Sequence, residues 1–342
     1  MTSPNNFIIP MFLIFTTWML PYVMSSRVLE PYLSNKHEKW MTQFGKSYKD
    51  AAEKEKRFQI FKNNVEFIEL FNAVGNKPFN LSINHFADLT NEEFKASLNG
   101  NKKLHDKFDI LNETTSFRYH NVTSVPASMD WRKRGAVTPI KNQGSCGSCW
   151  AFSTVASIEG IHQITTGELV SLSEQELIDC VRGNSSGCSG GYLEDAFKFI
   201  AKKGGMASET NYPYKETDEK CKFKKESKHV AEIKGYEKVP SNSENDLLKA
   251  VANQPVSVYV DAGDYVFQFY SGGIFTGKCG TDTDHVVTIV GYGVSLDYTE
   301  YWLVKNSWGT GWGEKGYMKL KRNVDSKKGL CGIATNPSYP VA

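Results

Sequence analysis

The chain has 342 residues, of which 40% are hydrophobic and 13% aromatic, so it can bury at least one large core. Its charged fraction of 23% and formal net charge of +2 exclude a disordered chain and give no field that would gather nucleic acid or an anionic membrane. We therefore expect a globular protein with no nucleic-acid partner.

The first apolar run extends from Phe7 to Leu20. About 14 residues at ~1.5 Å rise are too few for the ~30 Å core of a bilayer, whereas such a run suits a signal peptide. Small residues just before Arg27 offer a cleavage site, although the usual positive charge ahead of the run is missing. We predict a signal peptide at residues 1–26 and no stable membrane insertion. The alternative is an uncleaved signal anchor.

Four glycosylation sequons support passage through an oxidising secretory route, although each match alone is weak. Their asparagines are Asn80, Asn112, Asn121 and Asn184. We therefore expect the secretory pathway as the location, with an extracellular, vacuolar or lysosomal destination.

Residues 27–124 contain no cysteine and show a helical periodicity over residues 35–73. A stripe recurs there at steps of three and four residues, and it consists of Glu53, Arg57, Phe61, Asn64, Ile68 and Asn72. These steps place the stripe along one helix face. A separate helical domain would explain the pattern without any further role.

The chain has seven cysteines, all after residue 145. They are Cys146, Cys149, Cys180, Cys188, Cys221, Cys279 and Cys331. In an oxidising compartment six are expected to pair, so one needs a chemical reason to stay a thiol. We choose Cys149, because the stretch 150–159 is typical of a buried helix and the first turn of a helix stabilises a thiolate.

The CxxC spacing of Cys146 and Cys149 leaves two other chemistries to weigh. A zinc site would need a second such pair or a nearby histidine motif, and Cys180 and Cys188 are eight residues apart. A dithiol oxidoreductase would need a βαβ context, whereas a Gly-containing polar loop precedes the pair. Free-thiol counting would distinguish these cases, because a redox pair has two thiols and a lone nucleophile has one.

Three histidines lie outside the cysteine-free leading segment and are candidates for a catalytic base. His162 follows Cys149 on the same predicted helix, so ~1.5 Å per residue places it ~20 Å away. His229 follows a charged stretch that is typical of a solvated loop. His285 remains, at the mouth of a buried strand. On this pattern alone, a structural histidine is still the commoner explanation.

The stretch 143–153, QGSCGSCWAFS, closely resembles the active-site signature of papain-like cysteine proteases. Residues 283–285 (TDH) and 304–313 (VKNSWGTGWG) are similar to the histidine and asparagine blocks of that family, in the same chain order. The resemblance covers the whole chain and is strongest to plant members. It implies an α+β fold with two lobes, one helical and one resembling a β-barrel.

The resemblance implies a cysteine endopeptidase in which Cys149 attacks the scissile carbonyl and His285 later protonates the leaving amine. Asn306 would orient the imidazole, and Trp308 would keep water away from their hydrogen bond. Gln143 would donate to the developing oxyanion beside the backbone N–H of Cys149. No metal and no cofactor is expected.

Gly190 and Gly191 match the family's substrate-pairing segment, where bare backbone can form strand-like hydrogen bonds with an extended peptide. The resemblance adds further residues to the substrate-binding surface, namely Tyr192, Leu193, Asp284, Val286 and Trp308. Tyr259 and Asn336 stand where many relatives carry small or apolar residues. We therefore expect a shortened or more polar pocket for the side chain two positions before the cut.

Six cysteines can pair in fifteen ways, and only the resemblance selects among them. It implies three disulfides, namely Cys146 with Cys188, Cys180 with Cys221, and Cys279 with Cys331.

The leading segment, residues 27–124, resembles an inhibitory pro-segment, both in the helical stripe and in a second motif of Asn84, Phe86 and Asp88. The mature peptidase domain would then span 125–342, with a helical lobe at about 125–235 and a β-rich lobe at about 236–342. We expect acid to release the segment by protonating carboxylates such as Glu53 and Asp88.

The expected partners are protein and peptide substrates, the chain's own pro-segment and cystatin-like inhibitors, and the enzyme is expected to be a monomer. A catalytically silent relative that binds or stores is the leading alternative of another class. Its usual mark is a lost nucleophile or base, and none of Gln143, Cys149, His285 and Asn306 is missing.

Overall fold

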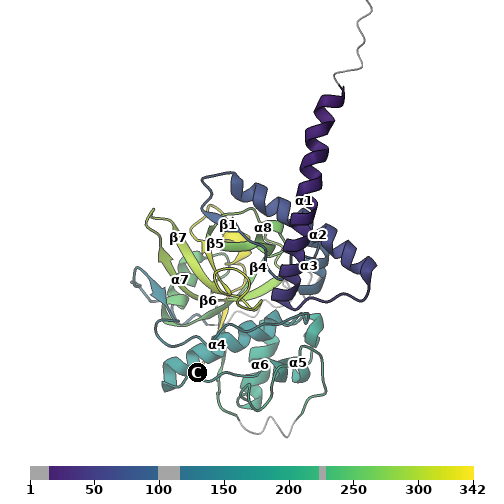
Figure 1. Ribbon diagram of the computed structural model, residues 1–342. Helices are drawn as coiled ribbons and strands as arrows, with labels where there is room; N and C mark the ends of the chain where they lie inside the picture. The colour runs from purple at the N-terminus through teal and green to yellow at the C-terminus, as the bar shows by residue number, and fades with distance from the viewer. Residues whose placement is uncertain (1–14, 99–115, 223–228) are drawn as a thin grey trace, which may run out of the picture. The chain divides into compact units, whose positions relative to one another are not determined.

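The computed structural model describes residues 15–98, 116–222 and 229–342 (Figure 1). The chain divides into two compact units, one ending at Glu66 and the other spanning Phe67–Ala342. The predicted pro-segment is therefore not one independent block, because its described residues from Phe67 onward fold together with the predicted peptidase domain.

The first unit is built from helix α1 (Phe15–Phe44) and most of helix α2 (Ala51–Ala73). The periodicity over 35–73 predicted one helical region, and the structure interrupts it near Gly45, which has a φ of 61°. Asp50 Oδ1 then accepts a hydrogen bond from Glu53 N–H at 2.8 Å and caps the start of α2. Among the described helices, none is long and apolar enough to cross a membrane.

An aromatic cluster joins the two helices within the first unit. The buried His37 ring lies against four other rings at centroid distances of 4.9 to 6.1 Å, those of Trp40, Tyr48, Phe58 and Phe61. Such ring contacts stabilise a helix pair beyond the area that they bury. The predicted stripe on α2 is consistent with this packing, because Phe61 and Asn64 are buried and Glu53 pairs with Arg57 at 2.7 Å.

The second unit combines helices with one large sheet, as the α+β prediction requires. Its helices are α3 (Asn91–Leu98), α4 (Cys149–Thr166), α5 (Glu174–Cys180), α6 (Leu193–Lys203), α7 (Glu244–Asn253) and α8 (Tyr265–Gln268). Its strands are β1 (Phe79–Leu81), β2 (Met129–Asp130), β3 (Gly235–Lys238), β4 (Val256–Val260), β5 (Tyr270–Phe275), β6 (His285–Val294), β7 (Glu300–Lys305), β8 (Tyr317–Lys321) and β9 (Ser338–Val341). The strand order is β1-β5-β8-β7-β6-β4-β9-β3, and β2 pairs with β6.

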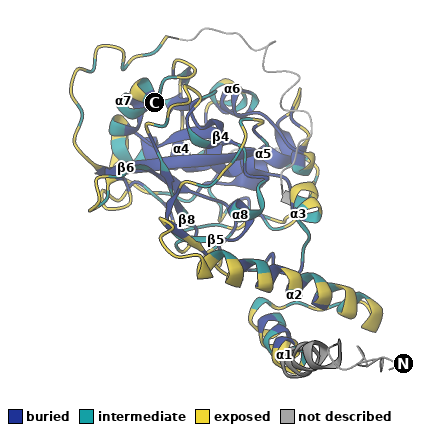
Figure 2. Cartoon of the chain, turned by 90° about the horizontal axis from the view of Figure 1, so that it is seen from above, coloured by how far each residue is buried: buried dark blue, intermediate teal, exposed yellow. Residues whose placement is uncertain are grey.

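Helices α4, α5 and α6 lie together, and the strands lie on the other side of α4 (Figure 1). Helix α4 is buried from Cys149 to Ile161, and Figure 2 shows it inside the unit. The division of the predicted lobes at residue 235 is not clean, because Met129 and Asp130 pair with β6 although they belong to the predicted helical lobe.

The predicted pro-segment contributes a strand to the sheet. β1 pairs antiparallel with β5, with Phe79 opposite Gly273. Gly273 has a φ of 86°, and a Cβ there would lie 2.3 Å from the carbonyl oxygen of Pro78, so only glycine permits this approach. Asn84 extends the attachment by donating its side-chain N–H to the Gln268 carbonyl at 2.8 Å.

The second unit contains the three disulfides that the resemblance implies. The bonds are Cys146–Cys188, Cys180–Cys221 and Cys279–Cys331. Cys149 is the one cysteine of the chain left as a thiol. Because Cys146 is paired with Cys188, the CxxC sequence does not form a dithiol.

Candidate active site

Cys149 is the first residue of α4 and is only 4% exposed. The loop before it is held by the Cys146–Cys188 disulfide and by a hydrogen bond of 2.9 Å from Gly147 N–H to the Cys188 carbonyl. The helix therefore presents its N-terminal end, where backbone N–H groups favour a negative charge, at the thiol.

His285 is the first residue of β6 and is fully buried. Its Nε2 lies 2.8 Å from Asn306 Oδ1, which also accepts the backbone N–H of Ser307 at 2.8 Å. Because that atom accepts a backbone N–H, it is the amide oxygen, and Nε2 must carry the proton. His285 Nδ1 is then the basic nitrogen, and it has no hydrogen-bond partner among the described residues.

Trp308 covers the imidazole. The two rings stack with centroids 4.5 Å apart and an interplanar angle of 25°, and Trp308 is 1% exposed. Two pro-segment rings, Phe86 and Phe94, meet Trp308 edge-on at 5.6 and 5.3 Å. The hydrogen bond between His285 and Asn306 therefore lies in an apolar surrounding, which strengthens it.

The helix of Cys149 is bonded directly to the strand of His285. Ser153 Oγ, one turn along α4, donates to the Val287 carbonyl at 2.8 Å and lies 3.0 Å from Thr288 Oγ1. The backbone at Val286 also acts on the thiol of Cys149 by a hydrogen bond that favours its charged form. The predicted nucleophile and the predicted base thus lie on a helix and a strand that hydrogen bonds hold in a fixed relative position.

Burial keeps both groups neutral in the precursor. Desolvation raises the pKa of Cys149 to about 12, although backbone hydrogen bonds at Val286 and Trp150 oppose it. Desolvation lowers the pKa of His285 to about 4, although the hydrogen bond that its Nε2–H donates to Asn306 opposes this shift. At neutral pH the precursor therefore holds a thiol and an imidazole, not an ion pair.

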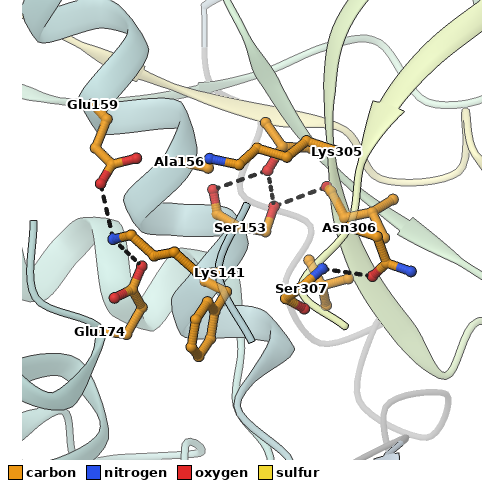
Figure 3. Close-up of a pocket in the computed structure, with 12 residues that line it drawn as sticks. Lys141, Ser153, Ala156, Glu159, Glu174, Lys305, Asn306 and Ser307 are labelled. Atoms are coloured by element: carbon orange, nitrogen blue, oxygen red, sulfur yellow. Dashed lines mark hydrogen bonds and ion pairs between the residues drawn. The ribbon is translucent and has the colours of Figure 1, made fainter. Parts of the chain in front are cut away.

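A buried charged cluster lies beside this site (Figure 3). Lys141 Nζ lies between two carboxylates, at 3.0 Å from Glu159 and 2.7 Å from Glu174. Lys305, from β7, donates instead to the carbonyl and hydroxyl oxygens of Thr138. These side chains and Asn306 line a cavity of about 20 Å³ between α4 and the sheet.

The single ammonium group of Lys141 contacts two carboxyl groups in this cluster, and these contacts and burial change the pKa values of Lys141 and Glu174. Burial alone would lower the pKa of Lys141, but Glu174 and Glu159 raise it above its usual value. Burial raises the pKa of Glu174 to about 8, against the opposing effect of Lys141. We infer that Glu174 holds a proton at neutral pH while Lys141 stays charged.

We expect Lys141→Met to lower the free energy of unfolding by about 3 kcal/mol at pH 7, because it leaves buried carboxylates without their cation. Urea unfolding followed by tryptophan fluorescence measures this. Lys133→Met is the matched control, because Lys133 is exposed, and it should change stability by less than about 0.5 kcal/mol. Equal stability of the two variants would contradict the expectation.

The structure places four of the nine predicted substrate residues in one cluster with Cys149. Tyr192, Leu193, Tyr259 and Val286 belong to one buried cluster that includes Cys149. Among the glycines, Gly191 lies so close to the ring of Trp150 that a Cβ would approach it to 2.5 Å. Gly190, with a φ of 108°, ends a short 3-10 turn at Gly187–Ser189.

Tyr259 and Asn336 differ in what the structure shows of them. Tyr259 is 1% exposed, its hydroxyl accepts from the Leu193 N–H at 3.1 Å, and it donates to Glu194 at 3.3 Å. It is thus a polar group inside the apolar cluster. Asn336 is half-buried, and none of the described contacts joins it to the cluster.

Asp284 lies where the pro-segment approaches the site. A Cβ on Gly263 would lie 2.9 Å from the Asp284 carboxylate and 2.8 Å from the Lys95 side chain. Lys95 belongs to α3, so this pro-segment helix approaches the residue before His285. The predicted sequons Asn80, Asn121 and Asn184 are exposed, and Asn112 lies outside the described residues.

Some site residues were not predicted from the sequence. Ser307 Oγ donates to Gln143 Oε1 at 2.6 Å, while the Gln143 amide donates to the Cys146 carbonyl at 3.0 Å. The adjacency of Ser307 to Asn306 was the only available signal. The cluster of Lys141, Glu159 and Glu174 had none, because charged residues far apart in sequence are usually solvated.

Profile matches cover both predicted regions. Residues 125–341 match the profile described as "Papain family cysteine protease", and residues 37–94 match "Cathepsin propeptide inhibitor domain (I29)". The chain belongs to the papain family of cysteine proteases. It is a cysteine endopeptidase made as a precursor, and its I29 propeptide acts as an intramolecular inhibitor.

Two similar proteins are plant enzymes. The chain is 54% identical over 325 residues to the senescence-specific cysteine protease SAG39 of Oryza sativa subsp. indica, covering 94% of each chain. It is 51% identical over 316 residues to the senescence-specific cysteine protease SAG12 of Arabidopsis thaliana, covering 91% of each.

Solved precursors share the fold. The proform of the ragweed pollen allergen Amb a 11 matches with a TM-score of 0.85 and 42% identity, covering 90% of this chain and 94% of that one. Recombinant stem bromelain precursor matches with a TM-score of 0.83 and 44% identity, covering 90% and 98%. The papain-like fold of the prediction is therefore confirmed.

Proposed function

We propose that Cys149 is the nucleophile, His285 its base and Asn306 the residue that orients the base. The observation that carries this assignment is the hydrogen bond between His285 Nε2 and Asn306 Oδ1, which leaves Nδ1 as the proton acceptor. In acylation, the thiolate would attack the scissile carbonyl while the imidazolium protonates the leaving amine. In deacylation, His285 would take a proton from water, which then hydrolyses the thioester.

Gln143 would stabilise the oxyanion together with the backbone N–H of Cys149. Its support is positional, because the Gln143 amide is held on one side by the Cys146 carbonyl and on the other by Ser307. A donor fixed before the reaction lowers the barrier without further reorganisation. Gly190 and Gly191 would pair with the substrate backbone beside it.

The substrate pocket would be lined by Tyr192, Leu193, Asp284, Val286 and Trp308, with Tyr259 and Asn336 narrowing it or making it more polar. The buried hydroxyl of Tyr259 supports the second point. Comparing cleavage of peptides with Phe, Val or Pro two positions before the cut tests it. A clear preference for Phe would reject a shortened pocket.

We expect Asn306→Ala to lower kcat by about tenfold to 30-fold while KM changes less than twofold, because the variant loses an orienting contact and not a substrate contact. Hydrolysis of a fluorogenic peptide over a range of concentrations measures this. Asn306→Asp is the companion variant, because it keeps the acceptor oxygen, and it should recover most of the rate. An Asn306→Ala enzyme with unchanged kcat would contradict the orienting role.

The chain would carry a signal peptide at 1–26, a pro-segment at 27–124 and a mature domain from 125. Acid would loosen the pro-segment, in which Glu53 pairs with Arg57 and Asp88 is buried. The secretory pathway, leading to the vacuole, lysosome or extracellular space, suits such an activation. The mature enzyme would be a monomer that cystatin-like inhibitors recognise.

Labelling with the E64 inhibitor tests the catalytic assignment, since bromelain from Ananas comosus was solved in complex with it. The precursor is kept at neutral pH or acidified, and label is located by peptide mass spectrometry. We expect label on Cys149 only after acidification, and none in Cys149→Ala. Label in the Cys149→Ala variant would overturn the assignment.

A further inference from the structure

A short segment just ahead of the proposed mature domain is folded against the sheet. Residues 117–122 form two overlapping turns, in which the His120 N–H donates to the Phe117 carbonyl at 3.2 Å and the Val122 N–H donates to the Tyr119 carbonyl at 3.0 Å. These residues lie in the same compact unit as the sheet. Connecting segments are usually mobile unless contacts fix them, so this order indicates specific contacts with the sheet.

Glu237 on β3 receives most of the polar contacts of this segment. Arg118 donates to Glu237 Oε1 from Nε and Nη2, both at 3.2 Å, and its backbone N–H donates to Oε2 at 2.9 Å. Ser116 Oγ adds a bond of 3.3 Å to Oε1. A carboxylate that accepts two guanidinium bonds and a backbone N–H recognises arginine in one orientation.

Two aromatic side chains of the segment flank this ion pair. Phe117 and Tyr119 pack against the ring of Tyr339 on β9, with centroids 6.4 and 5.3 Å apart. The Tyr119 hydroxyl donates a hydrogen bond to Gln254 Oε1 at 2.8 Å. Without this acceptor, the partly buried hydroxyl would lack a hydrogen-bond partner. Phe117, Arg118 and Tyr119 thus each contact a residue of the β3–β9 strand pair.

The receiving surface is rigid. Glu237 and Tyr339 are cross-strand partners in the β3–β9 pair, and the Tyr339 hydroxyl donates to Glu237 Oε2 at 2.7 Å. Gln254 is 1% exposed and donates to the Pro340 carbonyl at 3.0 Å. This edge of the sheet lies three strands from β6, which carries His285, so the surface is separate from the catalytic strand.

The contact persists in acid. Burial alone would raise the pKa of Glu237, but hydrogen bonds from Tyr339 and Arg118 lower it below its usual value. The charged and titratable groups that face the carboxylate are Arg118, Tyr119 and Tyr339. A lowered carboxyl pKa gives stability that is present above the unfolded value of about 4.5 and is lost only below it. At pH 5 the Glu237 carboxylate therefore remains charged, and its ion pair with Arg118 is retained.

We propose that Glu237, Gln254 and Tyr339 form a binding site for the chain's own Phe117, Arg118 and Tyr119, and that its occupation protects the peptide bonds ahead of the mature domain from proteolysis. A protease needs its substrate extended over several residues, so a bound turn must open before it is cut. The acid that loosens the rest of the pro-segment leaves this site occupied. Removal of residues 116–124 is then a separate and slower step of maturation.

Trypsin reports on this site directly, because it cuts after Arg118 when that residue is free. The test uses the full-length Cys149→Ala precursor, so self-processing plays no part and the result is independent of the catalytic assignment. Cleavage after residue 118 at pH 7 is followed by mass spectrometry. We expect it to be about tenfold faster in Glu237→Gln, the factor for loss of a charged hydrogen bond.

Two further variants make the result specific. Arg118→Lys keeps a trypsin site and the Tyr339 to Glu237 bond but loses the paired guanidinium contacts, so cleavage after residue 118 should again accelerate by about tenfold. Glu232→Gln, at an exposed glutamate close by in sequence, should match the parent precursor. Equal cleavage rates after residue 118 in all four precursors would overturn the proposal.

Discussion

Replacing Cys149 or His285 with Ala should lower kcat/KM by on the order of 10⁶-fold, and replacing both should lower it no further. The thiol is a poor nucleophile without a base, and the base has nothing to activate without the thiol, so the two act as one unit. Each precursor is processed with added pepsin, the pepsin is then inhibited, and hydrolysis of a fluorogenic peptide is measured.

His162→Ala is the matched control for this series. His162 lies on the same helix as Cys149, and it should lose less than about twofold because it is too far along α4 to share the proton. Melting temperatures confirm that each variant is folded. A Cys149→Ala enzyme with more than about 1% of the parent activity would show that another group attacks the substrate.

The Cys149 thiol of the precursor should react with iodoacetamide on the order of 10³-fold more slowly at pH 6 than that of the processed enzyme. With a pKa of about 12, only ~10⁻⁶ of the precursor thiol is ionised at pH 6. A thiolate of high pKa is also the stronger nucleophile, and this offsets about half of the loss in reaction rate on a logarithmic scale. Removing the rings of Phe86 and Phe94 from Trp308 opens the site to water, which favours the ion pair of Cys149 and His285.

The pH dependence separates this effect from simple access. The precursor rate should rise tenfold for each pH unit from 6 to 9, because the pKa of its thiol lies above that window. The rate of the processed enzyme should be nearly flat from about pH 5 to 8, where its thiolate is already formed. A flat profile for the precursor would show that its thiol is ionised, contrary to the burial argument.

The surface at Glu237 and the thiol at Cys149 suggest that maturation depends on two separate contacts of the pro-segment. Near the catalytic strand, Phe86, Phe94 and Lys95 approach Trp308 and Asp284 and keep the site buried. At the far edge of the sheet, Arg118 contacts Glu237, whose carboxyl pKa is lowered by its hydrogen bonds, and this contact would hold the segment ahead of residue 125. Opening the first contact would activate the enzyme before the second is removed.

Much of this protein could be read from its sequence, because the chemistry lies in contiguous motifs. The stretch 143–153 predicted the nucleophile and the helix that follows it, and the blocks at 283–285 and 304–313 predicted the base and its orienting residue. The buried helix that follows Cys149 and the buried strand that begins at His285 also followed from local patterns. The break of the leading helical region near Gly45 was missed, because an isolated glycine is tolerated within a helical pattern.

Tertiary structure alone decided what joins residues that are distant in sequence. Three contacts depend on which elements pack together. They are the cluster of Lys141, Glu159 and Glu174, the pairing of β1 with β5, and the contact of Arg118 with Glu237. From the sequence alone, a charged residue is expected at the solvated surface. Only the packing shows that some of these residues are buried as ion pairs with changed pKa values. The sequence by itself thus predicted the catalytic groups. The packing decided which groups are buried, which rings cover His285 and which strands contact the residues ahead of position 125.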